Sequence, residues 1–149
     1  MGQPLVRLIA ARRIFLAAAL LWSAAPSASP QTAPEAIQIE LNRLEDQGNS
    51  CRAYLVIANP GAVSYTGFKL DLVVFDRSGT IIRRLALDLA PLRAQKTSVK
   101  VFDIADTGCK AIGSVLLNEV LDCRDSGGEI SDCVQRVSTS SKLPVSLSK

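Results

Sequence analysis

The stretch Phe68-Lys69-Leu70-Asp71-Leu72-Val73-Val74-Phe75-Asp76-Arg77-Ser78-Gly79 decides the fold class of this chain. Apolar and polar residues alternate along its first part, which is the period-two pattern of a half-buried strand. The polar residues and the glycine at positions 76–79 favour a tight reversal, and a second strand is expected over residues 80–88. The sequence therefore predicts an antiparallel hairpin over residues 68–88.

Strand patterns also stand on both sides of this hairpin. Further strands are predicted from Ile37 up to a turn at residues 46–49, over residues 51–59, over residues 95–104 and over residues 109–120. Residues 51–59 carry apolar side chains on both faces, as a central strand covered on both sides does. Helical periodicity is nearly absent from residue 37 onward.

The same period predicts which way the side chains of the later strands point. Val99 and Val101 are expected to point inward. Three apolar residues of the next strand are expected to share one face: Ile112, Leu116 and Val120. Glu119 is expected to point outward, with Leu117 or Val115 inward, because a buried carboxylate needs partners.

The end of the chain is less regular. Residues 129–138 fit either an edge strand or a short helix capped by Ser131 or Asp132. Residues 138–149 are Ser-rich and polar, which predicts a flexible tail. Six or seven short strands without alternating helices indicate two packed sheets. We therefore predict an all-β fold, an immunoglobulin-like antiparallel β-sandwich of six or seven strands over residues 37–137.

The N-terminus has the layout of a signal peptide over residues 1–27. Three arginines precede an apolar run at residues 14–22, and a small, Pro-rich stretch follows. The run is shorter than the roughly 20 apolar residues that cross a bilayer, so no stable membrane anchor is expected. Cleavage is expected after Ser27, within a wider window at residues 25–36, and residues 28–36 form a Pro/Ala-rich linker.

An adjacent arginine pair stands within this leader. Arg12, Arg13, Phe15 and Leu16 lie in the run R-R-x-F-L, which resembles the twin-arginine export motif. A general secretory signal that contains adjacent arginines is the alternative. Both routes use the export machinery as a partner and place the mature protein in the periplasm or outside the cell.

Four cysteines remain after the leader: Cys51, Cys109, Cys123 and Cys133. An oxidising compartment favours pairing them, and four cysteines allow three connectivities. We favour Cys51 with Cys109 and Cys123 with Cys133, because the second pair brackets a flexible turn at residues 125–128. A zinc site is the competing interpretation, but it lacks paired C-x-x-C spacing and any histidine.

Charge and composition exclude several classes of function. The net charge of +3 comes from three arginines of the leader, because the remaining 17 − 3 = 14 cations balance 14 acids. Binding to nucleic acid is therefore not expected. The chain has no histidine and no G-x-S-x-G pattern. We predict a protein without catalytic residues, cofactor or metal, which acts as a binding or structural interaction module for a protein partner.

Two alternatives to this function stay open. Four acids around the last two cysteines offer oxygen ligands to calcium or a small ligand, although a solvated acidic loop held by a disulfide is the favoured explanation: Asp122, Asp125, Glu129 and Asp132. A hydrolase that uses paired carboxylates is the second alternative. Arg83 and Arg84 beside Asp76 and Asp88 fit either a binding patch or cross-strand ion pairs.

Parts of the chain resemble a known family. Residues 55–59 end a strand in Asn, residues 68–79 end one in an aromatic-Asp-x-x-Gly turn, and Leu89-Ala90-Pro91-Leu92 forms a later loop. These features resemble the FxLYD-type immunoglobulin-like domains of secreted bacterial proteins, and the chain is also similar to small bacterial twin-arginine signal proteins. The resemblance implies a fold and no catalytic residue. It departs at Arg93-Ala94, where those domains usually have Gly.

Overall fold

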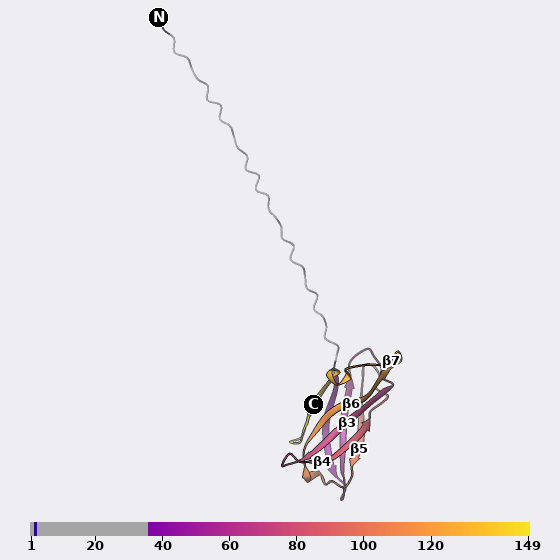
Figure 1. Ribbon diagram of the computed structural model, residues 1–149, viewed down its shortest axis with the longest axis vertical. Helices are drawn as coiled ribbons and strands as arrows, with labels where there is room; N and C mark the ends of the chain where they lie inside the picture. The colour runs from indigo at the N-terminus through magenta and orange to yellow at the C-terminus, as the bar shows by residue number, and fades with distance from the viewer. Residues whose placement is uncertain (1, 3–35) are drawn as a thin grey trace. The chain divides into compact units, whose positions relative to one another are not determined.

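A computed structural model describes residues 36–149 together with Gly2 (Figure 1). The predicted signal peptide, its arginine motif and the linker up to residue 35 lie outside the described residues. Within the described part, no helix is long and apolar enough to cross a membrane.

Nine strands form two sheets in the described chain. The first sheet has the order β5-β2-β1-β8 and consists of β1 (Ile37–Asp46), β2 (Cys51–Asn59), β5 (Lys96–Ile104) and β8 (Val137–Ser141). The second sheet has the order β4-β3-β6-β7, with β9 also paired to β6, and consists of β3 (Gly67–Asp76), β4 (Ile81–Asp88), β6 (Ile112–Asp125), β7 (Gly128–Glu129) and β9 (Ser146–Ser148). Two 3-10 turns, η1 (Cys109–Ala111) and η2 (Cys133–Arg136), precede β6 and β8.

The described chain crosses between the two sheets five times to make a β-sandwich. The β1–β2 hairpin lies in one sheet, the predicted β3–β4 hairpin lies in the other, and β5 returns to pair with β2. This confirms the all-β sandwich and the hairpin over residues 68–88. Alternate residues of both sheets fill the space between them, and side chains such as Leu55, Leu70 and Val74 are at most 2% exposed. Each contributes about 1.5–3 kcal/mol by leaving water.

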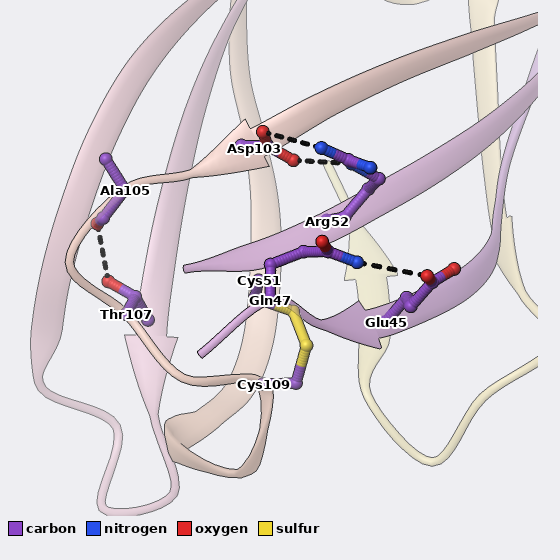
Figure 2. Close-up of a disulfide and its surroundings, with 8 residues drawn as sticks. All are labelled: Glu45, Gln47, Cys51, Arg52, Asp103, Ala105, Thr107 and Cys109. Carbon is purple, nitrogen blue, oxygen red and sulfur yellow. Dashed lines mark hydrogen bonds and ion pairs between the residues drawn. A yellow bond between two sulfur atoms is a disulfide. The ribbon is translucent and has the colours of Figure 1, made fainter. Parts of the chain in front are cut away.

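Both favoured disulfides are present. Cys51–Cys109 ties the start of β2 to η1 and so joins the two sheets at one end (Figure 2). Cys123–Cys133 ties β6 to η2. In the chain-entropy model, loops of these lengths contribute about 4 and about 3 kcal/mol respectively.

The predicted flexible tail at residues 138–149 is wrong. β8 pairs in parallel with β1, and β9 pairs in parallel with β6, so the sandwich is not purely antiparallel. Val137 and Leu147 are 1% and 7% exposed and anchor this Ser-rich segment in the core. The prediction relied on the average polarity of the segment, which does not register two apolar residues at core positions. Serines also form the backbone hydrogen bonds of a sheet as other residues do. Residues 129–138 contain both η2 and the start of β8, which settles the choice between helix and strand as a mixture.

Two predictions of side-chain direction are also wrong. Val99 and Val101 point outward and are 61% and 45% exposed, because pairing with β2 turns the other face of β5, which carries Phe102 and Ile104, toward the core. In β6, the buried aliphatic residues are Ile112, Val115 and Leu117 instead of Ile112, Leu116 and Val120. Register shifts against β3 interrupt the simple period there. Glu119 is exposed, as predicted.

Candidate interaction surface

An apolar strip lies on the outer face of the first sheet. In β2, Leu55 points into the core, so its neighbour Val56 points outward. The pairing with β5 places Val99 directly opposite Val56 and Val101 opposite Tyr54. We call Val56, Val99 and Val101 the valine strip. Two of its three side chains keep large exposed fractions although they sit in regular strands.

The ion pair between Arg52 and Asp103, drawn in Figure 2, lies at one end of the valine strip, two positions beyond the pair of Tyr54 and Val101. The guanidinium of Arg52 donates two hydrogen bonds to Asp103, at 2.8 and 3.2 Å. These bonds hold the pKa of the Asp103 carboxyl below its ordinary value. The hydroxyl of Tyr54 donates to Glu45 at 3.0 Å, and Arg43 lies 5.5 Å from the centre of the Tyr54 ring. The polar groups at this end are therefore occupied by one another.

The strand β5, which carries Val99 and Val101 of the valine strip, is at the edge of its sheet. β5 pairs with β2 on one side, and in the described chain no strand pairs with its other side. Lys96 and Lys100 lie along this edge, and no ion pair joins either of them to an acid among the described residues. The edge therefore offers backbone hydrogen-bonding groups, apolar side chains and positive charge together.

A shallow hollow of about 260 Å³ lies at the start of β5 and is lined by Pro91, Leu92, Arg93, Lys96 and Ser98. Asn59 is 3% exposed, and its amide donates to the carbonyls of Val63 at 2.7 Å and Arg93 at 3.1 Å. These bonds join the two loops beside the hollow. In this loop Gln95 adopts a positive φ of 52°, a backbone conformation that residues other than Gly take up only rarely.

The outer face of the second sheet contains a buried carboxylate. The side chain of Asp71 in β3 is 4% exposed, and Arg84 of β4 donates to both of its oxygens at 2.8 and 2.7 Å. Asn118 of β6 donates to it at 2.7 Å. The bonds from Arg84, and then from Asn118, lower the pKa of Asp71. Three neighbouring strands are pinned by this cluster, which the sequence did not reveal.

One alternative for the two hairpin arginines, a cross-strand ion pair, is present at Arg84, but neither arginine pairs with Asp76 or Asp88. Arg84 pairs with Asp71, and Arg83 lies 3.6 Å from Asp106 in the segment after β5. Asp76 instead accepts hydrogen bonds within its own turn, from Ser78 and Thr80. Asp88 accepts one from the backbone of Ala90. Short polar side chains beside turns satisfy nearby backbone groups first, which removes them from cross-strand pairing.

The acids near the last two cysteines are dispersed. Arg124 donates to both oxygens of Asp122, at 2.7 and 2.6 Å, and Asp125 accepts from the backbone of Gly127 at 2.7 Å. The bonds from Arg124 lower the pKa of Asp122. Among the described residues, no group of three or more acids, cysteines or histidines is arranged to hold a metal ion.

Comparison with known proteins bears on the fold alone. The chain is similar in structure to IrmA from Escherichia coli, with a TM-score of 0.51 and 13% sequence identity over 70% of this chain and 90% of that chain. No protein-family model matches the chain, and no curated protein matches it. At this low identity, the structural match supports the β-rich fold of this chain and carries no function.

Proposed function

We propose that this protein is a non-catalytic binding module of the periplasm or the cell exterior, and that it binds a protein partner through the open edge of β5. The observation that carries the proposal is the valine strip beside the open side of the edge strand β5. Apolar side chains on such an edge do not serve the core, and strand addition would cover them and satisfy the free backbone groups.

Other features of the chain support this proposal. The most deeply buried acid among the described residues, Asp71, has both oxygens occupied by Arg84 and Asn118, which leaves it poorly placed to accept a proton from a substrate. Two disulfides are typical of oxidising compartments, in agreement with the export signal expected from the sequence.

A pull-down with matched variants tests the proposal. The tagged protein is mixed with a periplasmic extract beside the double variant Val99→Lys/Val101→Lys and the control Leu121→Lys, which alters a leucine that is 53% exposed in β6 of the other sheet. We expect an enriched protein that the β5 variant loses and the β6 control retains. Circular dichroism establishes that all three proteins keep their β spectrum. An absence of any enriched partner, or equal capture by both variants, would contradict the proposal.

A further inference from the structure

We infer that β5 selects an extended partner strand that carries acidic residues opposite Lys96 and Lys100 and apolar residues opposite Val99 and Val101. This inference rests on the proposed function and specifies the chemistry of the partner. It also excludes a second copy of this chain as the occupant of the edge.

The two faces of β5 differ in charge. Lys100 is paired with Leu55, which points into the sandwich, whereas Val99 is paired with Val56 on the outer face. Residues two apart share a face, so Lys96 and Lys100 lie on the inner side of the edge, and Val99 and Val101 lie on the outer side. A strand added to the open edge continues both faces, because directly opposite residues share a face.

No residue of β5 neutralises these lysines. The acid of the strand, Asp103, is held by Arg52, and Arg93 adds another cation beside Lys96 in the hollow at the start of the strand. No ion pair involves Arg93, Lys96 or Lys100 within residues 36–149. The charge that complements this edge must therefore come from the partner.

A second copy is a poor occupant for the same reason. Two β5 strands can pair antiparallel with their outer faces continuous. In each such register whose symmetry centre lies between residues 98 and 101, Lys100 is directly opposite or diagonal to Lys96 or Lys100 of the second copy. Like charges at these positions are destabilising, and an inward-facing charge on an edge strand discourages edge-to-edge association. The same lysines attract an acidic strand, so they discriminate between the two partners.

The geometry specifies a sequence pattern. Opposite positions 101 to 96, an antiparallel partner reads apolar-acid-apolar-x-x-acid, for which Val-Glu-Val-Ser-Thr-Glu is a suitable probe. The first glutamate faces Lys100, the last faces Lys96 at the hollow, and the valines cover Val99 and Val101.

Fluorescence anisotropy with labelled peptides tests this inference on the full chain. Three peptides with identical Gly-Ser flanks contain the probe sequence, the same sequence with Lys in place of Glu, or the same sequence with Ser in place of Val. We expect saturable, salt-sensitive binding of the acidic probe. The affinities of the other two peptides should be weaker by at least about tenfold. The variant Lys96→Glu/Lys100→Glu should reverse the preference between the acidic and basic peptides. The control Lys110→Glu, which changes an exposed cation of η1, should leave it unchanged.

Each other outcome overturns the inference. Equal binding of the acidic and basic peptides would show that the edge has no charge preference, although the proposed function would stand if the pull-down retained its partner. No binding of any peptide would also refute the inference, and the pull-down would then judge the proposed function separately. A dimer of the protein alone in analytical ultracentrifugation, dissociated by Val99→Lys, would make a second copy the occupant.

Discussion

The outer faces of the two sheets both carry valines and ion-paired side chains, but the valines are covered on one face and exposed on the other. On the second sheet, Asp71 is bonded to Arg84 and Asn118, and Val73 beside it is only 7% exposed. On the first sheet, Val99 is 61% exposed on a strand with one open edge. A face whose groups satisfy one another serves the fold, whereas a face that leaves apolar groups in water at an edge is available to a partner.

The largest expected effect concerns the Cys51–Cys109 disulfide, which links β2 of the first sheet to η1, directly before β6 of the second sheet. Removal of the Cys51–Cys109 bridge by the double substitution to alanine should lower the free energy of unfolding by about 4 kcal/mol, because the unfolded chain regains the entropy of a long loop. Urea denaturation measures this change. The matched comparison replaces Cys123 and Cys133 with alanine. Because the disulfide it removes closes a shorter loop, the free energy of unfolding should fall by about 3 kcal/mol. A larger loss from the short loop would contradict the entropic explanation.

A pair of valine substitutions tests the comparison directly. Val73→Ala should cost about 2 kcal/mol of unfolding free energy, because it removes buried methyl groups from between Arg84 and Leu116. Val99→Ala should cost at most about 0.5 kcal/mol, because its side chain is mostly in water. Thermal and urea denaturation give both values. Equal costs would mean that the valine strip is part of the structural core and not an available surface.

The pH dependence of stability should differ between the two faces. Because the pKa of folded Asp71 lies below its ordinary value of 3.8, its contribution is fully present above that value and is lost as the pH falls through the folded pKa. Asp71→Asn should therefore lower stability at pH 7 and reduce the fall in stability during acid titration. Asp103→Asn should do the same to a smaller extent, because the side chain of Asp103 is 46% exposed and water replaces its partner. Denaturation midpoints measured from pH 7 to pH 2 distinguish the two variants.

The smallest expected effect is that of calcium. Because Arg124 occupies both oxygens of Asp122, we expect no heat of binding and no change in the unfolding temperature when calcium is added. Isothermal titration calorimetry checks this expectation. Saturable heat that disappears in Asp122→Asn would favour the alternative of a calcium-binding accessory protein.

The sequence predicted the regular parts of the fold well. Alternation over residues 68–72 and the turn after Asp76 indicate the β3–β4 hairpin, and the spacing of Cys123 and Cys133 around a flexible turn favoured the observed bridge. Both predictions depend on residues close together in the chain. Local patterns of this kind survive folding because the strand period and the turn geometry are properties of the backbone.

The parts that failed depend on contacts between distant strands. In β5, Val99 and Val101 compete with Phe102 and Ile104 for the core, and pairing with β2 decides between the two faces. The partners of Asp71 depend on register shifts along β6 that no local pattern shows. The interaction surface was therefore missed.

The C-terminal segment affects the stoichiometry of any complex. Because β8 extends the first sheet and β9 lies along β6 of the second, that flank of the sandwich ends in strands of five and three residues, whereas β5 on the opposite flank has nine. A partner strand can therefore pair along nine residues of β5 on one flank, but only along short strands on the other flank. Because β5 has a single open side, an assembly built through β5 alone should hold one added strand per molecule.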